Sequence, residues 1–317
     1  MPLDPRAKRF LDALAAGRPH ETSGTTLVER RLAIAELMKL SGPEAAVGPI
    51  EERTLPGPLG QALAVRIYTP LDATAAILPG LIYFHGGGLV SGSVATHDFI
   101  GRSLANSGAC RVISVEYRLA PEHPFPAALN DALAAVTYIG DHAARFGIDA
   151  ARLGICGDSA GGTLAAVTCQ TVARIGGPSL ALQLLICPIL DYSRSGGSRQ
   201  DFASGYLLER ATLDHDLLHY TAPGTDPADP RISPLRAEDV TGLPRTLIHT
   251  AEFDPVRDDG WDYFQRLTRA QAEVSYTCHP GMIHLFYCLG AVIPYARTAF
   301  VLMGGEIRAA LANLRRD

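Results

Sequence analysis

Short apolar runs rich in β-branched and aromatic residues alternate along this chain with longer helical patterns, and this alternation constrains the fold most strongly. The runs expected to form strands lie at 65–68, 81–84, 112–117, 153–156, 182–189, 246–250 and 274–278. The clearest helix between them is expected over about 126–146, because apolar residues recur on one face and Gly147 can end it. Strand, helix and strand in repetition predict an α/β fold with a mostly parallel sheet covered on both faces.

Two segments stand outside this alternation. Residues 1–50 carry helical patterns at 5–16 and 26–40, and the span of about 192–235 is rich in proline and glycine with one helical stretch at 207–220. Long segments of this kind in compact domains are usually lids or binding elements. We therefore expect an N-terminal helical cap at 1–50 and a main domain over 51–317, with a cap insertion at about 192–235.

The charge, hydropathy and cysteine patterns exclude several classes of partner. The formal net charge of −5 and the absence of long lysine or arginine runs leave no basic field for nucleic acid or anionic lipid, so a small neutral partner is expected. No stretch approaches the roughly 18 apolar residues of a membrane span. The six cysteines occur singly, mostly inside apolar runs, which favours buried thiols and a cytoplasmic location over disulfides or zinc.

The stretch LGICGDSAGG, residues 153–162, places Ser159 between Gly157 and Gly161 directly after an apolar run. A sharp strand-to-helix turn holds such a serine in a strained conformation, and a side chain two residues away on either side would collide with the turn. The turn exposes the Ser159 hydroxyl and presents the free N–H groups of the helix start, that of Ala160 first. The same pattern also occurs in glycine-rich turns without chemistry and in phosphate loops, so the motif alone is not decisive.

A second glycine-rich motif, His85-Gly86-Gly87-Gly88, follows the expected strand at 81–84. Consecutive glycines let backbone N–H groups approach a ligand closely, as stabilisation of a developing oxyanion requires. The spacing of a dinucleotide loop is absent and no lysine follows as in a P-loop, so phosphate binding is disfavoured. His85 is expected to orient the glycines through a local hydrogen bond, although a role as base stays open.

A serine nucleophile needs a base to remove its proton, and the base needs an acid to hold its tautomer. Among the ten histidines, His284 follows the strand at 274–278 on a loop expected at the same sheet edge as Ser159. His279 lies too close to the strand end to move freely, and His249 lies inside a strand and is expected to pack in the core. We therefore expect His284 to be the base.

Four carboxylates crowd the segment in which the acid is expected. Asp254 follows a buried strand and precedes Pro255, which suits a carboxylate that must reach sideways to the next loop. Glu252 could point the same way, whereas Asp258 and Asp259 are expected to open a helix and to have a structural role. Asp254 could also merely cap that helix. The chain order of serine, aspartate and histidine is that of α/β-hydrolases.

Five motifs in this order resemble those of the bacterial hormone-sensitive-lipase-like esterases, the GDSAG subgroup of family IV. They are HGGG, YRLAPEHPFPAALND (117–131), GDSAGG, DPVRDDG (254–260) and GMIHLF (281–286). The resemblance extends from about residue 63 to the C-terminus. It implies the α/β-hydrolase fold and a serine carboxylesterase that hydrolyses short- to medium-chain carboxylic esters through an acyl-enzyme intermediate.

The resemblance also implies a set of site residues. They are a catalytic triad of Ser159, Asp254 and His284, an oxyanion hole formed by the N–H groups of Gly87, Gly88 and Ala160, and supporting positions at His85, Gly86, Gly157, Asp158 and Gly161. No metal or cofactor is implied, the partner is a small ester, and a homodimer is possible. Asp259 stands where many members have glutamate, and Leu285 stands where glycine is common after the histidine.

Two alternatives from other functional classes remain. The first is a non-hydrolytic small-molecule receptor on the same fold, as in the plant gibberellin receptors; such a protein can dispense with the catalytic histidine, which this chain keeps as His284. The second is a metal site in HDLLH, where His215 and His219 would share a helix face. This motif lacks the glutamate of HExxH and no third ligand is evident, which disfavours metal chemistry.

Overall fold

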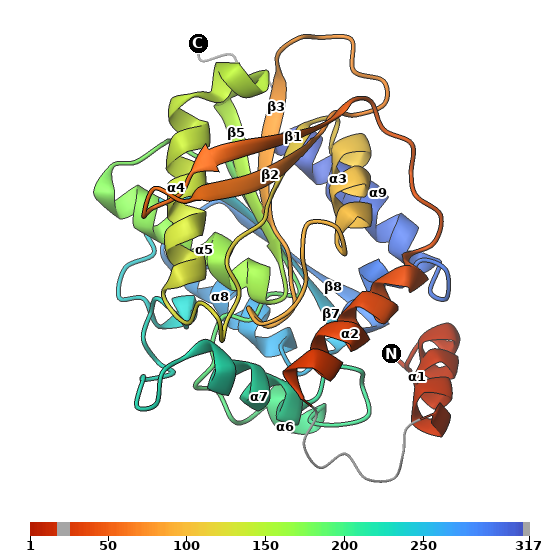
Figure 1. The fold of residues 1–317 in the computed structure, drawn as a ribbon. Helices are drawn as coiled ribbons and strands as arrows, with labels where there is room; N and C mark the ends of the chain where they lie inside the picture. The colour runs from red at the N-terminus through yellow and green to blue at the C-terminus, as the bar shows by residue number, and fades with distance from the viewer. Residues whose placement is uncertain (18–25, 313–317) are drawn as a thin grey trace.

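A single eight-stranded sheet forms the centre of the computed structural model, which describes residues 1–17 and 26–312 (Figure 1). The strands are β1 (Ile50–Pro56), β2 (Ala62–Tyr68), β3 (Leu78–Phe84), β4 (Arg111–Val115), β5 (Ile148–Asp158), β6 (Leu182–Ile186), β7 (Arg245–Phe253) and β8 (Val274–Ile283). Their order is β1-β2-β4-β3-β5-β6-β7-β8. Pairing is antiparallel from β1 to β4 across β2 and parallel through the remaining strands, so the predicted mostly parallel sheet is confirmed.

Helices cover both faces of this sheet, as the alternation predicts. One face carries α4 (Ala127–Asp141), α5 (Ala160–Ile175) and α8 (Arg257–Arg269), and the other carries α3 (Asp98–Gly108) and α9 (Tyr295–Ala310) (Figure 1). Each layer encloses its own cluster of buried aliphatic and aromatic side chains against the sheet. Because both faces of the central strands are covered, ligands of such a sheet are expected to bind at the carboxyl ends of its strands.

Two of the expected elements end earlier than predicted, and one strand was not predicted. The helix expected over 126–146 stops at Asp141 and continues only as the short η2 (Ala143–Phe146), which Gly147 ends with φ of 63°. The strand expected to run to Ile189 ends at Ile186, because Cys187 takes a φ of 44° and turns the chain. β1 was not predicted, because its sequence IEERTLP is mostly polar and only one of its residues is buried.

The two segments expected to form a cap lie near the carboxyl ends of the strands, at the lower part of Figure 1. The first holds α1 (Pro5–Gly17), α2 (Leu27–Met38) and η1 (Lys39–Ser41); the second holds α6 (Ser198–Asp201), α7 (Arg210–Tyr220) and η3 (Pro234–Arg236). The helix expected from Leu207 begins only at Arg210, since Leu207 has a φ of 74°. The division into 1–50 and 51–317 stays a prediction, and positions 18–25 lie outside the described residues.

Capping explains where α2 begins. Thr26 is its N-cap, the Thr26 side chain accepts a hydrogen bond from the Glu29 N–H, and the Glu29 carboxylate accepts from the Thr26 N–H. This reciprocal pair stabilises the first turn of an otherwise short helix. The position of α2 above the sheet edge is set by long-range contacts described below.

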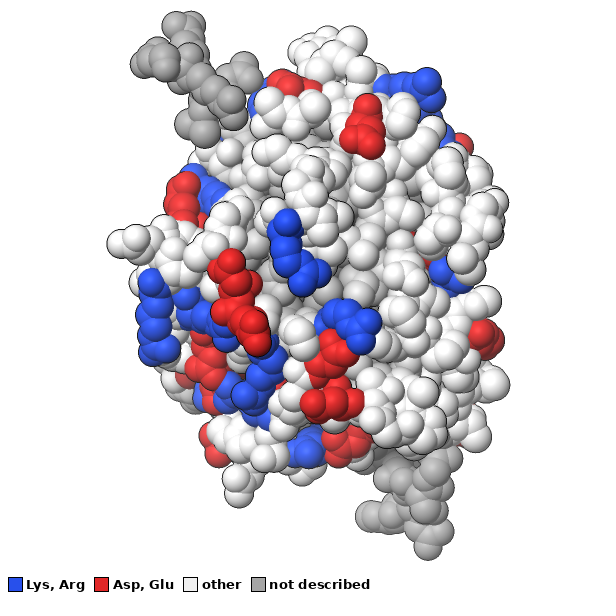
Figure 2. Space-filling model, turned by 90° about the vertical axis from the view of Figure 1, so that its left-hand side faces the viewer, with Lys and Arg blue, Asp and Glu red and all other residues white. Residues whose placement is uncertain are grey.

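The surface carries both signs of charge. On the face in Figure 2, lysine and arginine side chains lie beside aspartate and glutamate side chains, and much of the remaining area is uncharged. Among the described helices, none combines the length and apolarity needed to cross a membrane.

Candidate active site

Ser159 occupies the turn between β5 and α5 in a strained conformation, with φ of 53° and ψ of −122°. A Cβ atom added to Gly157 would lie 2.1 Å from the Gly161 carbonyl oxygen, so the turn itself excludes a side chain there. A Cβ atom on Gly161 would instead lie 2.0 Å from the carbonyl oxygen of Phe84. The second glycine is therefore required by the end of β3, and not by the turn as the sequence suggested.

Three buried side chains from separate strand ends form a continuous hydrogen-bonded chain. Asp254 follows β7, His284 follows β8, and Ser159 follows β5. His284 Nε2 lies 3.0 Å from Ser159 Oγ, and His284 Nδ1 lies 2.7 Å from Asp254 Oδ2. Because an ionised carboxylate only accepts, Nδ1 carries the proton and Nε2 accepts from the serine hydroxyl. This geometry can deprotonate Ser159 as it attacks an electrophile.

The glycine motif after β3 leaves backbone donors unpaired beside the serine. Gly87 and Gly88 have φ of 118° and 69°, a region that favours glycine. Within residues 1–17 and 26–312, the N–H groups of Gly87, Gly88 and Ala160 donate to no protein group. Unpaired N–H groups next to a nucleophile are the donors that stabilise a tetrahedral oxyanion.

Asp158 ties the glycine loop to the serine turn. Its Oδ1 accepts from the Tyr83 hydroxyl at 2.5 Å and from the Gly86 N–H at 2.9 Å, and its Oδ2 accepts from the Tyr287 hydroxyl at 3.0 Å. Burial raises the pKa of Asp158, and the hydrogen bond from Tyr83 opposes that rise. Sequence reasoning missed both tyrosines, although each lies beside a motif, before HGGG and just after GMIHLF.

The His85 side chain packs beside the glycine loop and contacts its backbone. Its Nδ1 lies 2.7 Å from the Gly86 carbonyl oxygen, and its ring stacks on His97 and Tyr117 with centroids 5.0 and 4.4 Å away. Burial lowers the pKa of His85 to about 3 and that of His97 to about 4. These contacts agree with the expected orienting role, which stays a prediction.

The two histidines set aside as bases pair with each other. His279 Nε2 lies 3.1 Å from His249 Nδ1, and both rings are buried. Burial lowers the pKa of His279 to about 3. His249 lies inside β7 and His279 inside β8, so neither is part of the chain from Asp254 to Ser159.

Acid should destabilise this protein well above the pH at which most carboxylates titrate. His85, His97 and His279 have lowered pKa values in the folded state, so the unfolded chain binds more protons once the pH falls below 6.5. Each then removes about 1.4 kcal/mol per pH unit from the free energy of unfolding until the pH reaches its folded pKa. Together they should remove on the order of 5 kcal/mol between pH 7 and pH 5. Urea unfolding curves over this range measure the loss.

A matched pair of variants tests whether the buried histidines cause this pH dependence of the unfolding free energy. His279→Gln removes one buried imidazole and should flatten the dependence of the unfolding free energy on pH, whereas His123→Gln alters an exposed one and should not. An unfolding free energy that stays constant from pH 7 to pH 5 contradicts the expectation.

The neighbouring aspartates have structural contacts other than those predicted. α8 begins after Val256 with Asp258 and Asp259 in its first turn, as predicted, but neither side chain forms a cap hydrogen bond with the helix. Asp258 Oδ2 accepts from the Ser198 N–H of α6 at 2.8 Å, and Asp259 Oδ2 accepts from the Leu190 N–H at 2.9 Å. They fix the cap insertion and the chain after β6 instead.

A cavity of about 330 Å³ opens onto Ser159 and His284 between the two cap segments. Most of its wall is apolar and comes from α2, α7 and the residues just before α7. The lining residues are Leu14, Arg30, Ala33, Ile34, Leu37, Met38, Gly87, Gly88, His97, Ser159, Ile189, Leu207, Leu208, Thr212, Leu213, Asp216, His284 and Leu285. Leu285 adopts a φ of 61°, a region that favours glycine, and its side chain lines the cavity.

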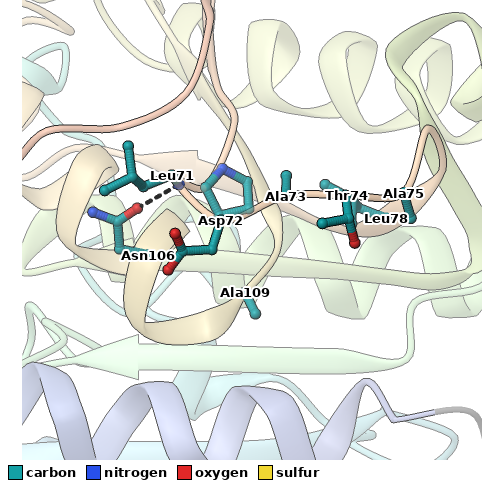
Figure 3. Close-up of a pocket in the computed structure, with 9 residues that line it drawn as sticks. Leu71, Asp72, Ala73, Thr74, Ala75, Leu78, Asn106 and Ala109 are labelled. Atoms are coloured by element: carbon teal, nitrogen blue, oxygen red, sulfur yellow. Dashed lines mark hydrogen bonds between the residues drawn. The ribbon is translucent and has the colours of Figure 1, made fainter.

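A second cavity, of about 380 Å³, lies at the opposite end of the sheet (Figure 3). It is lined by residues 70–75, Leu78, Asn106 and Ala109, at the start of β3 and the end of α3. The Asn106 side-chain oxygen accepts from the Leu71 N–H at 2.9 Å. Because its lining contains no paired nucleophile and base, the cavity at Ser159 is the candidate active site.

The described residues bring one group of potential metal ligands together, Cys187, Asp254 and His284. Hydrogen bonding between Asp254 and His284 already accounts for two of them. His215 and His219 share a face of α7 as predicted, but His219 Nδ1 is hydrogen-bonded to the His215 carbonyl oxygen at 2.9 Å.

Comparisons with known proteins show which family this chain is similar to. A family model described as alpha/beta hydrolase fold matches residues 81–288. The carboxylesterase NlhH of Mycobacterium tuberculosis is 37% identical over 94% of this chain and 92% of its own length. The ethyl acetate hydrolase of Pseudomonas putida is 35% identical over 96% of this chain and 98% of its own.

Solved structures show the same likeness. The ester hydrolase EH1AB1 from the metagenome of Lake Arreo, solved with a derivative of bipyridine phosphonate, superposes with a TM-score of 0.93 at 41% identity, covering 97% of this chain and 98% of that one. The esterase of the archaeon Pyrobaculum calidifontis superposes with a TM-score of 0.88 at 32% identity, covering 98% and 99%.

Proposed function

Because the chain belongs to the alpha/beta hydrolase fold family, in its hormone-sensitive-lipase-like branch, and is a carboxylic-ester hydrolase, we propose that Ser159, His284 and Asp254 are its nucleophile, base and acid. The observation that carries this assignment is the bridge that His284 forms, with Ser159 on one ring nitrogen and Asp254 on the other. The named relatives are esterases, and nothing favours a non-hydrolytic receptor on the same fold.

In the acylation step, Ser159 Oγ attacks the ester carbonyl carbon while His284 Nε2 takes the hydroxyl proton. The carbonyl oxygen becomes an oxyanion and accepts hydrogen bonds from the Gly87, Gly88 and Ala160 N–H groups. Asp254 holds the imidazole in the correct tautomer and stabilises its charged form. The intermediate collapses, the C–O bond to the alcohol breaks, and the alcohol leaves with the proton from His284.

In the deacylation step, a water molecule takes the place of the alcohol. His284 Nε2 removes a proton from the water as its oxygen attacks the acyl carbon, and the same N–H groups hold the second oxyanion. Collapse of this intermediate breaks the bond to Ser159 Oγ, which regains its proton from His284, and the carboxylic acid leaves. The two half-reactions together consume one water per ester.

The size of the cavity sets the expected substrates. An apolar pocket of about 330 Å³ enclosed by two cap segments accommodates short and medium acyl chains. We expect kcat/KM for p-nitrophenyl esters to peak at acyl chains of about four to eight carbons and to fall toward sixteen, since buried apolar area adds binding energy only while the chain fits. A panel of p-nitrophenyl esters of graded length measures this.

The same panel can contradict the enclosed pocket. A steady rise in kcat/KM toward sixteen carbons, or a sharp rise at an oil–water interface, is the behaviour of an open lipase site and not of this cavity. Monomeric substrate below its solubility limit is the control for the interface measurement.

Two further proposals concern the cellular location and the oligomeric state of the enzyme. A cytoplasmic location is supported by six free cysteines, five of them buried. A homodimer is supported by β8, which ends the sheet order and, among the described strands, pairs only with β7. Light scattering coupled to gel filtration tests the dimer.

A further inference from the structure

An ion pair crosses the wall of the substrate cavity between the two cap segments. Arg30 on α2 donates from Nε to Asp216 Oδ1 at 3.2 Å and from Nη2 to Asp216 Oδ2 at 2.8 Å. The Arg30 side chain is 15% exposed and that of Asp216 4%. Both residues line the same cavity as Ser159 and His284, whose wall is otherwise largely apolar.

The carboxylate of this pair lies against the oxyanion loop. A Cβ atom added to Gly88 would lie 1.9 Å from Asp216 Oδ2, so the carboxylate occupies the space directly beside this glycine. The Gly88 N–H is one of the three proposed oxyanion donors. A negative charge at this position opposes the negative charge that develops on the substrate oxygen, and a water-excluded cavity strengthens the repulsion.

The stability of the fold does not explain why a charged pair is buried at this place. Replacing a buried ion pair by apolar residues of similar volume is often neutral or stabilising, because desolvation offsets the attraction. Asp216 lies within α7 and does not cap it, since this helix runs from Arg210 to Tyr220. Besides Arg30, Asp216 has His215 as an ionisable neighbour, whose Nδ1 lies 3.4 Å from Asp216 Oδ1. The Asp216 charge also contributes, after burial, to the raised pKa of Tyr192.

We infer that Arg30 is a positioning residue for ester hydrolysis: it neutralises Asp216 and holds its carboxylate so that an oxyanion can form beside Gly88. The inference rests on the proposed function. It makes α2 part of the reaction, because the guanidinium reaches Asp216 only when this helix lies over the cavity. The residue acts through Asp216 and is not required to touch the substrate.

Removing the guanidinium while keeping the carboxylate is the direct test. Arg30→Gln should lower kcat for p-nitrophenyl butyrate by roughly 10- to 100-fold, the effect expected of one uncompensated unit charge close to the oxyanion in a partly solvated site. KM should change by less than about 3-fold, because the neutral ground-state ester responds weakly to the unpaired charge. In the double variant Arg30→Gln/Asp216→Asn, the repulsion disappears and most of the kcat should return.

A second arginine on the same helix provides the matched control. Arg31 donates from Nε to the Val90 carbonyl oxygen at 2.8 Å and from its terminal nitrogens to Glu122, so it anchors α2 without touching Asp216. If Arg31→Gln lowers kcat because α2 is held less firmly, adding Asp216→Asn should not restore that kcat. Recovery confined to the Arg30 background separates charge neutralisation from anchoring of the cap.

Several outcomes would overturn the inference. It fails if Arg30→Gln keeps the kcat of the unaltered enzyme, or if the double variant is as slow as the single one. Should Arg30→Gln not fold, as judged by circular dichroism, Arg30→Lys serves instead: the lysine keeps the positive charge but loses the two-point contact, so kcat should fall by less than about 10-fold, and a larger loss contradicts neutralisation. Failure of the proposed function would appear separately, as full activity of Ser159→Ala.

Discussion

Replacing Ser159 by alanine is expected to lower kcat for ester hydrolysis by on the order of 10⁵-fold or more, because no other group can form the acyl-enzyme. The fold should persist, since within the described part of the chain the hydroxyl is hydrogen-bonded only to His284, and the backbone strain belongs to the turn. Steady-state hydrolysis of p-nitrophenyl butyrate measures the loss, and urea midpoints show whether the variant is folded.

The covalent intermediate provides an independent readout. A fluorophosphonate probe should add to the peptide that contains Ser159 in the unaltered protein and to no peptide of Ser159→Ala, as determined by mass spectrometry. Ser195→Ala, an exposed serine of the cap insertion, should be labelled and active like the unaltered protein. Retention of near-normal turnover in Ser159→Ala would exclude a serine mechanism.

Replacing Asp254 by asparagine should lower kcat by on the order of 10⁴-fold, as loss of the triad acid does in serine proteases. Asp254 Oδ2 accepts from His284 Nδ1, while its Oδ1 accepts from the Val256 N–H at 2.9 Å. An asparagine that keeps its oxygen on Val256 presents its NH₂ group to His284. The imidazole must then accept at Nδ1 and carry its proton on Nε2, where it can no longer deprotonate Ser159.

The neighbouring carboxylates serve as controls, because their oxygens are held elsewhere. Glu252 Oε2 accepts from the Gly281 N–H at 2.7 Å, and Asp258 bonds the Ser198 N–H. Glu252→Gln and Asp258→Asn should keep kcat within about 10-fold and lower the urea midpoint, each costing about 1 kcal/mol for a weakened hydrogen bond. The assignment is wrong if Asp254→Asn keeps most of its turnover while one of these variants loses it.

Local sequence patterns predicted the central strands because each contains the apolar, β-branched residues that a doubly covered sheet requires. They failed at β1, because this edge strand is mostly polar and buries only one residue. A segment of that composition is hard to tell from a loop by its sequence. They also placed the start of the α7 helix too early, because Leu207 is a good helix former held at positive φ by its surroundings. The periodicity of hydrophobic residues shows which face of an element is buried. The signal is therefore weak wherever an element buries little surface.

The candidate site likewise contains residues that local patterns predicted and residues that only the fold brings together. The residues expected to form the triad and the oxyanion hole follow strand ends or glycine turns, and their local chemistry, a serine between two small residues or a carboxylate before proline, is written in neighbouring positions. Asp158 with Tyr83 and Tyr287, and Arg30 with Asp216, are pairs separated by 75, 129 and 186 positions. Whether such side chains meet depends on how helices pack on the sheet and how the caps lie over its edge. The sequence by itself therefore determined which groups can react, and only the tertiary structure decided which charges and hydrogen bonds surround them, because those partners come from segments that no local period relates.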